Sequence, residues 1–345
     1  MSLRKNLFFT VIAAVSMLYG CTNNSKSDKN ISVTRDVFAM DTYMNLKAYG
    51  KNGESAIDEA EKRIYELENE LSATLQTSDI WKINHACGAE TAINDDTALL
   101  IAKALDIGES THGALDITIF PVLKEWGFTT GKYHIPNNSK IDSLLENVDY
   151  SKIKLVENNV SIPESSEIDL GALAKGYTGD EIMKIFRSYN IDSAIVSLGG
   201  NVQALGSKPD GSSWKVAVRD PYSPEMDMCV VEVNNKAVIT SGNYERLFTG
   251  DDGSRYWHII DPADGYPADN GFVSVTVIGE NGLNCDCLST AIFVAGLGGY
   301  KDIIKDYPSY DFVFVTDDKK ILYTSGITDK FQNISSMTAE VINID

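Results

Sequence analysis

Basic residues are scarce in this sequence. Its 30 lysines and arginines face 49 aspartates and glutamates, so the formal net charge at pH 7 is −19. A protein that binds nucleic acid needs a basic face to neutralise phosphates, and this composition therefore argues against nucleic acid as a partner. A protein this acidic that binds an anionic ligand must compensate locally, with helix N-termini, a metal ion or a few basic side chains.

Cysteine is scarce too. Apart from Cys21, the chain has Cys87, Cys229, Cys285 and Cys287. A single residue separates Cys285 from Cys287, which is poor spacing for a disulfide and does not match a CxxC metal-binding pair. We therefore expect all four to be small structural residues rather than a disulfide framework or a metal site.

Long apolar runs are absent except at the N-terminus. Arg4 and Lys5 precede the apolar run from Leu7 to Leu18, which is too short to span a bilayer as a stable helix. The run ends in Leu18-Tyr19-Gly20-Cys21, a pattern that resembles the bacterial lipobox; the alternative is an ordinary signal peptide with a chance cysteine. We expect a lipoprotein signal peptide at 1–20, a lipidated Cys21 with a polar tether at 21–32, and one domain at 33–345. It would be lipid-anchored to a bacterial membrane and face the periplasm.

The order of predicted elements indicates an α+β fold. Alternation of apolar and polar residues predicts strand structure over Val37–Tyr49, and strands dominate from Ser193 to Ile278. Helices and strands do not alternate regularly as in βαβ units. Helices are predicted at Glu54–Leu71, at Asp96–Ser110, from Gly171 to about Tyr189, at Cys285–Gly296 and at Tyr300–Tyr307.

The stretch IDLGALAKGYTGDEI, residues 168–182, is a candidate phosphate site. It matches neither the P-loop pattern nor GxGxxG. However, Asp169-Leu170-Gly171 leads into a predicted helix, whose first amides would favour a phosphate. Asp169 would either cap that helix or accept a hydrogen bond from a ligand. The alternative is a capped helix with Lys175 on a solvated face.

A second helix carries a set of oxygen ligands. Asp286 and Thr290 are four residues apart and so share a helix face, with Ser289 beside them. A carboxylate with hydroxyls suits Mg²⁺, which also takes substrate phosphates as ligands; the alternative is a helix cap. Elsewhere His258 lies on a predicted strand that ends in Asp261-Pro262, where a side chain can face a site, although a lone strand histidine is more often structural.

Seven motifs, taken in this order, resemble the ApbE family of FAD:protein FMN transferases, once described as thiamine-biosynthesis lipoproteins. The resemblance extends from Met40 to the C-terminus. Two positions depart from the family pattern: Thr74 stands where a flavin-stacking tyrosine is common, and Cys287 where alanine is common. The motifs are Met40-Asp41-Thr42; Ala114 to Thr118 with Pro121 and Trp126-Gly127-Phe128; Asp169 to Tyr177; Leu198-Gly199-Gly200-Asn201; Thr240-Ser241-Gly242; His258 to Pro262; and Asp286 to Thr290.

This resemblance implies an ApbE-like fold of antiparallel-rich sheets flanked by helices, and a Mg-dependent enzyme. It would move FMN from FAD to a threonine or serine hydroxyl of a periplasmic or membrane electron-transfer protein, such as a subunit of a sodium-translocating quinone reductase, and release AMP. His258 would accept or orient the proton of that hydroxyl. Two alternatives stay open: FAD pyrophosphatase activity that gives FMN and AMP, and a non-catalytic FAD-binding lipoprotein.

The resemblance also assigns ligand contacts. The metal ligands would be the carbonyl of Ala172 and the side chains of Asp286, Ser289 and Thr290. The residues expected to contact FAD are Met40, Ala114, Leu115, Asp116, Asp169, Lys175 and Ile259, with Asp116 suited to accept from the adenine amino group.

Overall fold

The computed structural model describes residues 30–344, so the predicted signal peptide, Cys21 and most of the tether lie outside the described residues. A nine-stranded sheet forms the centre of the molecule, in the order β1-β2-β6-β7-β10-β13-β14-β15-β17, and only the β15–β17 pair is parallel. Its strands are β1 Ser32–Ala39, β2 Thr42–Tyr49, β6 Ser193–Leu198, β7 Asn201–Leu205, β10 Ala237–Gly242, β13 Phe272–Gly279, β14 Asp311–Thr316, β15 Lys320–Thr324 and β17 Thr338–Ile342.

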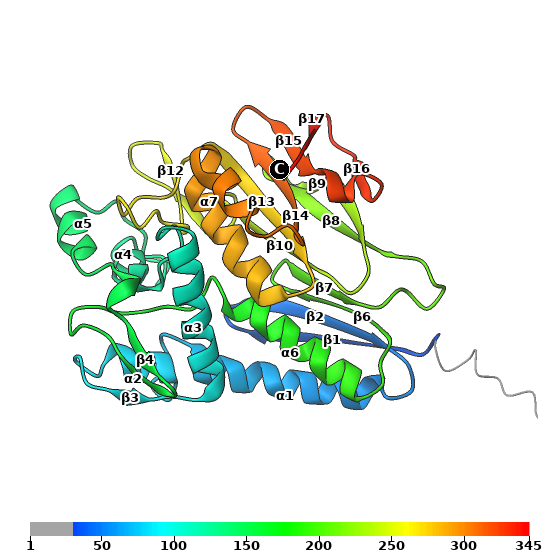
Figure 1. Cartoon of the computed structure of the whole chain (residues 1–345), viewed down its shortest axis with the longest axis horizontal. Coiled ribbons are helices and arrows are strands. Elements are labelled where there is room, and N and C mark those ends of the chain that lie inside the picture. The colour runs from blue at the N-terminus through cyan, green and yellow to red at the C-terminus, as the bar shows by residue number, and fades with distance from the viewer. Residues whose placement is uncertain (1–29, 345) are drawn as a thin grey trace, which may run out of the picture.

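Helices α1, α6 and α7 lie against one another on one face of this sheet (Figure 1). The three-stranded sheet β16-β9-β8 packs on the other face of the nine-stranded sheet. Successive strand residues point to opposite faces: in β14, Phe312 and Phe314 belong to the core that contains α7 residues, whereas Val313 and Val315 belong to the core that contains β8 and β9 residues. The predicted α+β class with antiparallel-rich sheets is therefore confirmed. The helices are α1 Gly53–Leu71, α2 Asp79–Asn84, α3 Asp95–Ser110, α4 Phe120–Glu125, α5 Asn138–Leu145, α6 Ala174–Ser188 and α7 Gly282–Ile304.

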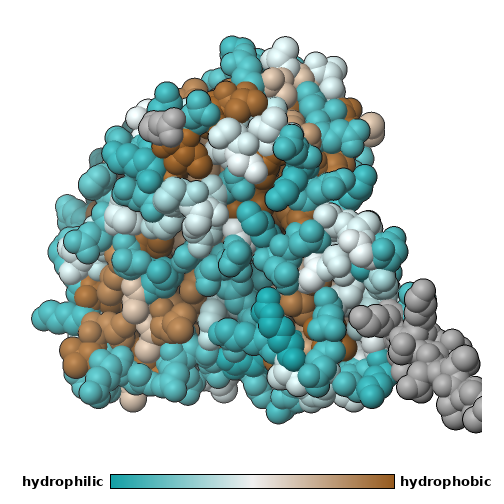
Figure 2. All heavy atoms as spheres, turned by 45° about the vertical axis from the view of Figure 1, so that its right-hand side comes forward, coloured by the Kyte–Doolittle hydropathy of each residue, from teal (hydrophilic) through white to brown (hydrophobic). Residues whose placement is uncertain are grey.

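Short elements complete the described chain. The remaining strands are β3 Thr91–Ala92, β4 Lys154–Val156, β5 Asn159–Ser161, β8 Trp214–Asp220, β9 Ser223–Val233, β11 Leu247–Thr249, β12 Arg255–Trp257 and β16 Phe331–Asn333. Short 3₁₀ helices occur at Ile117–Ile119, Tyr150–Lys152 and Ser325–Ile327. The face shown in Figure 2 is mostly hydrophilic, with hydrophobic side chains in separate patches.

The segment predicted as strand over Val37–Tyr49 is divided into two strands. Met40 and Asp41 form a two-residue turn with φ of 50° and 56°, and β1 pairs with β2 on either side of it. Alternation alone did not reveal this turn because neither residue is a glycine, the usual residue at positive φ. The turn is held in place by Glu68, whose carboxylate accepts from the Met40 N–H at 2.6 Å.

Helices α6 and α7 cross at two glycines. A Cβ added to Gly176 would lie 2.3 Å from the carbonyl oxygen of Gly282 and 2.6 Å from the Cβ of Asp286. Asp180, one turn further along α6, caps α7 by accepting from the N–H groups of Gly282 and Leu283 at 2.8 and 2.9 Å. This close approach brings the start of α6 against the first turns of α7, which is where the candidate site lies.

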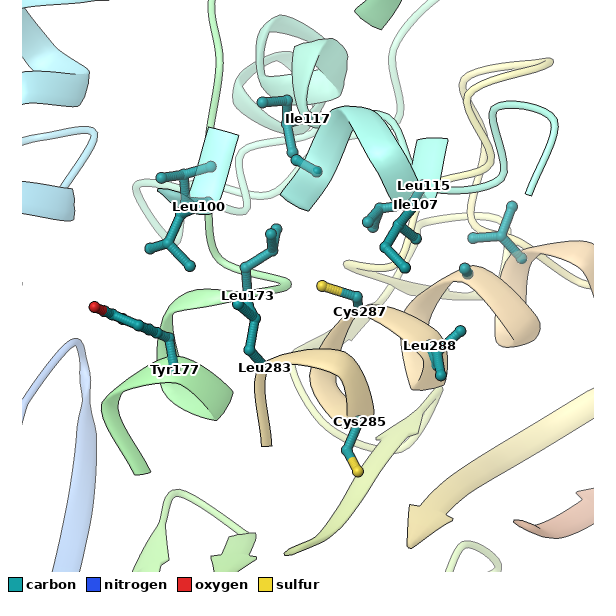
Figure 3. Packing of buried hydrophobic residues seen from close by; sticks show 14 of the residues in the cluster. Leu100, Ile107, Leu115, Ile117, Leu173, Tyr177, Leu283, Cys285, Cys287 and Leu288 are labelled. Atoms are coloured by element: carbon teal, nitrogen blue, oxygen red, sulfur yellow. The ribbon is translucent and has the colours of Figure 1, made fainter. Parts of the chain in front are cut away.

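Within residues 30–344, α7 is the one helix whose length and composition would allow it to cross a membrane. It is instead a core helix, because it packs against β10, β13 and α6. In Figure 3, Cys287 points into the cluster around Leu173, Ile107 and Leu115, whereas Cys285 points to the opposite side of α7. Both thiols and that of Cys229 are buried and free, whereas Cys87 is exposed.

The glycine contact yields a stability prediction. Gly176→Ala should lower the free energy of unfolding by about 1–3 kcal/mol, since the added methyl overpacks the α6–α7 contact. Gly298→Ala is the matched control: it lies in α7 with no atom within 4 Å of an added Cβ, and it should stabilise by about 0.5–1 kcal/mol. Denaturant unfolding of both variants measures the difference, and equal effects would show that the α6–α7 approach is not tight.

Candidate functional site

Asp286 is a buried carboxylate with no cationic partner. It is 4% exposed, and its two oxygens accept from neutral groups only, the N–H of Gly176 at 2.7 Å and the side-chain amide of Asn201 at 3.0 Å. Burial raises the pKa of Asp286, and the positive charge of Lys175 partly offsets that rise. A buried charge without a counter-ion is costly, so this carboxylate is well suited to bind a cation.

The carbonyl of Ala172 is left open by the same interaction. In a regular helix start, the N–H of Gly176 would donate to the carbonyl four residues earlier, which is that of Ala172. Here this N–H donates to Asp286 instead, and no described backbone group donates to the Ala172 carbonyl. The predicted direct entry from Gly171 into the helix is wrong, because residues 171–173 form a turn and α6 begins at Ala174.

Hydroxyl groups complete this oxygen cluster. The Ser241 hydroxyl lies 2.8 Å from that of Ser289 and 3.2 Å from that of Thr290, and Ser289 also donates to the backbone carbonyl of Asp286 at 2.9 Å. No three His, Cys, Asp or Glu side chains gather as a metal site in the described part of the chain. A cation here would therefore depend on one carboxylate with carbonyl and hydroxyl oxygens, which is a set that suits Mg²⁺.

Most residues predicted to contact FAD gather around one hydrophobic cluster. Leu115 and Ile259 are buried in it, and Met40, Ala114 and Ala172 pack against it. The same cluster contains Leu170 and Leu173 of the candidate phosphate segment and Cys287 of α7. These residues therefore belong to one large core, although some are more than 200 positions apart in the sequence.

Asp116 has internal hydrogen-bond partners. One carboxylate oxygen accepts from the N–H and the hydroxyl of Thr118, at 2.8 and 2.6 Å, and the other accepts from the N–H of Tyr150 at 3.0 Å. It thus caps the 3₁₀ helix Ile117–Ile119. A carboxylate oxygen has two lone pairs, so this structural role leaves capacity for one more donor.

Two basic side chains supply positive charge near the oxygen cluster. Burial raises the pKa of Asp169, while the N–H of Gly171, 2.9 Å away, and the charges of Lys175 and Arg246 oppose that rise. Lys175 donates to the carbonyl of Gly171 at 3.4 Å. Neither Lys175 nor Arg246 forms an ion pair with a described residue, so both remain available to an anionic ligand.

His258 lies at the end of β12. Its backbone N–H donates to the carbonyl of Arg246 at 3.2 Å, and its Nδ1 is buried without a hydrogen-bond partner. Burial, followed by the charges of Arg246 and Lys175, lowers the pKa of His258 to about 3. The imidazole is therefore neutral at physiological pH, and Nε2 is the nitrogen left for a reacting group.

Sequence reasoning missed three residues that shape the site. Asn201 orients Asp286, and Ser241 joins the hydroxyl cluster; both stand in motifs that we recognised, but nothing in the sequence gave their partners. Glu245 lies in the electrostatic field of Lys175, Arg219 and Arg246, and burial raises its pKa. Thr74, at the position where a flavin-stacking tyrosine is common in the family that the motifs resemble, is exposed and pairs with the Ser72 hydroxyl at 3.1 Å.

Comparison with known proteins places this arrangement in a family. The pattern that defines the ApbE family matches residues 40–314. The FAD:protein FMN transferase of Treponema pallidum is 29% identical over 319 residues, covering 86% of this chain and 88% of that protein. One from Klebsiella pneumoniae is 30% identical over 283 residues, covering 79% and 87%.

Solved structures agree with the sequence comparison. The crystal structure of the ApbE protein from Thermotoga maritima is similar with a TM-score of 0.79 and 30% sequence identity, covering 84% of this chain and 96% of that one. That of the Pseudomonas stutzeri flavinyl transferase ApbE has a TM-score of 0.73 and 27% identity, covering 83% and 92%. The resemblance inferred from the seven motifs is confirmed, and the chain belongs to the ApbE family.

Proposed function

We propose that this chain is an FAD:protein FMN transferase that depends on Mg²⁺. A threonine or serine hydroxyl of an acceptor protein attacks the phosphorus on the FMN side of FAD, a new P–O bond forms, and the bond to AMP breaks. Two observations carry this proposal: the buried Asp286 carboxylate forms no ion pair, and the Ala172 carbonyl has lost the helix-start donor that Asp286 takes. Catalysis of such a transfer depends mainly on positioning and charge neutralisation.

The metal would be held by Asp286, the carbonyl of Ala172 and the hydroxyl of Thr290, with Ser289 as a further ligand or support. Bound there, Mg²⁺ would neutralise charge that develops on the phosphates. Gly176 and Asn201 hold the Asp286 carboxylate in place through their N–H donors. The ligand carboxylate is therefore oriented before any metal arrives.

The residues around the hydrophobic cluster would hold FAD. Met40 and Ala114 are partly exposed apolar residues backed by the buried Leu115 and Ile259, and Asp116 has capacity to accept from the adenine amino group. Lys175 supplies positive charge beside the pyrophosphate, and Asp169 accepts a ligand hydrogen bond. Because the chain is strongly acidic, this local positive charge is what lets an anionic substrate approach.

His258 would take the proton of the acceptor hydroxyl at Nε2, or orient it. A neutral imidazole can accept a proton, and the low pKa of His258 keeps the ring neutral at physiological pH. A positioned general base typically contributes about 10²- to 10⁴-fold to the rate. Natural acceptors would be subunits of sodium-translocating quinone reductases or related electron-transfer complexes.

Mass spectrometry tests the proposal directly. The protein is incubated with FAD and Mg²⁺, with and without a purified flavin-carrying domain of a sodium-translocating quinone reductase, and AMP release is followed in parallel. We expect the acceptor mass to rise by one FMN, with AMP released only when acceptor is present. AMP and free FMN without acceptor would indicate a pyrophosphatase, and intact bound FAD without AMP would indicate a carrier.

Asp286→Ala should abolish the metal dependence. Loss of a ligand that supports several kcal/mol of charge stabilisation should reduce turnover by more than about a hundredfold. We also expect Mg²⁺ to raise the unfolding temperature of the wild type but not that of Asp286→Ala. Asp302→Ala is the matched control, because Asp302 pairs only with Lys305 on the surface; full Mg²⁺-dependent turnover in Asp286→Ala would refute the metal assignment.

The protonation of His258 gives a prediction about pH. Since its pKa in the folded protein lies near 3 and the ordinary value is 6.5, the unfolded state alone gains a proton as the pH falls below about 6.5. His258 therefore lowers the free energy of unfolding as the pH falls from 6.5 towards 3. Between pH 7 and pH 5, the free energy of unfolding of His258→Gln should fall less than that of the wild type. Unfolding curves at both pH values measure this, with NMR titration of the imidazole as a check; an inflection near 6.5 would contradict the neutral ring.

The N-terminal segment supports a proposal about location. We propose that Cys21 carries lipid and anchors the protein to a bacterial membrane on its periplasmic side. Mass spectrometry of the N-terminal peptide should find a diacylated Cys21, and Cys21→Ser should move the protein to the soluble fraction after cell lysis. An unmodified Cys21 with the protein already soluble would indicate an ordinary signal peptide.

A further inference from the structure

An aromatic surface flanks His258 and has no role in the chemistry described above. We call it the aromatic ledge; it consists of Phe128, Tyr133, Phe248 and Tyr256. The rings of Tyr133 and Phe248 are nearly parallel with centroids 5.0 Å apart, and Phe248 stacks on Tyr256 at 5.4 Å. At its inner end, the ring of Phe128 meets that of His258 edge to face at 6.4 Å. The ledge thus leads from the protein surface to the proposed base.

The outer part of the ledge contributes little to the core beneath it. That core is formed by Val122, Trp126, Ile141 and Ile260, and Phe128, Phe248 and Tyr256 pack against it. Tyr133 is not part of this cluster and is 41% exposed. Burial of apolar area stabilises a fold in proportion to the area removed from water. The exposed ring of Tyr133 therefore contributes little to the stability of this core, and folding alone poorly explains its position.

The strands that carry Phe248 and Tyr256 have a free edge. β11 and β12 form a sheet of only two strands, so within the described residues β11 pairs with β12 alone. His258 follows β12 directly, and its N–H continues the ladder to Arg246, which precedes β11. An extended peptide can add to an open strand edge through main-chain hydrogen bonds, while its side chains contact the neighbouring surface.

We propose that the aromatic ledge is the docking surface for the acceptor protein. An extended acceptor segment lies along β11, contacts Tyr133 and Phe248, and brings its threonine or serine hydroxyl to Nε2 of His258. This inference rests on the proposed function, because the segment held here is the acceptor of that transfer. Continuity of the ledge with His258 favours this occupant, and a net charge of −19 disfavours a second copy of the chain through mutual repulsion.

Steady-state kinetics with matched variants tests the docking surface. The variants are Tyr133→Ser and Tyr133→Ser combined with Phe248→Leu, which keeps apolar volume against the core. FMN transfer to the flavin-carrying domain of a sodium-translocating quinone reductase is measured at saturating FAD and Mg²⁺. Tyr43→Ser is the control, because Tyr43 is 79% exposed and stacks edge to face on Phe38 in a different hairpin.

We expect the KM for the acceptor domain to rise about tenfold in the Tyr133 variants, the usual effect of truncating an interface aromatic. The dissociation constant of FAD and turnover at saturating acceptor should stay unchanged, the unfolding temperature should stay unchanged in Tyr133→Ser, and Tyr43→Ser should match the wild type throughout. A KM that stays at the wild-type value in the double variant, or rises equally in Tyr43→Ser, would overturn the docking surface while transfer itself stands. No transfer by the wild type would overturn the proposed function and, with it, this inference.

Discussion

The hydrogen bond from the Gly176 N–H to the Asp286 carboxylate is the interaction on which the site depends. It fixes a buried anion that has no basic partner, and it diverts a helix-start amide away from the Ala172 carbonyl. One bond therefore sets the state of both proposed metal ligands, the Asp286 carboxylate on α7 and the Ala172 carbonyl in the turn before α6. It requires the backbones of α6 and α7 to approach closely, and only glycine at position 176 permits that approach, since a Cβ would meet Gly282 and Asp286.

An acidic protein needs an unusual way to bind an anionic substrate. The chain carries a net charge of −19, yet Lys175 and Arg246 stand free of ion pairs beside Asp169 and His258. Their charges act on both groups, opposing the rise in the pKa of Asp169 and lowering that of His258. The charges of Lys175 and Arg246 that would attract a pyrophosphate also help to keep His258 neutral. The same two side chains would thus influence both substrate binding and the protonation of the proposed base.

Much of the fold could be predicted because it depends on local patterns. Helical spacing of apolar residues predicted α1 and α3 to within a residue of their observed starts, but it did not show that α6 begins only at Ala174, since that start is set by contacts with α7. The turn at Met40 and Asp41 was missed for a similar reason: Glu68, 28 residues away, holds it. Motif order was sufficient to identify the family.

The site was less predictable because its partners come from distant segments. Helical spacing suggested Asp286 and Thr290 as ligands and the resemblance added Ala172, whereas the roles of Asn201 and Ser241 depend on hydrogen bonds between β7, β10 and α7. Side-chain type alone does not specify such partners. The structural role of Asp116 could not be predicted for the same reason. Its carboxylate accepts three hydrogen bonds, two from Thr118 and one from Tyr150, and the sequence alone did not indicate these donors.

The two ends of the site are built on different kinds of support. The oxygen cluster stands on α6, α7 and β10, which pack in the main core, and such rigid elements hold charged groups in the geometry that phosphoryl transfer requires. His258 and the aromatic ledge stand instead on a two-stranded hairpin and a loop over a small separate core. A peripheral hairpin can change its surface without disturbing the oxygen cluster, which suits the proposed role of the ledge in docking a protein partner. The division between a rigid oxygen cluster and a peripheral hairpin follows from where each lies relative to the nine-stranded sheet.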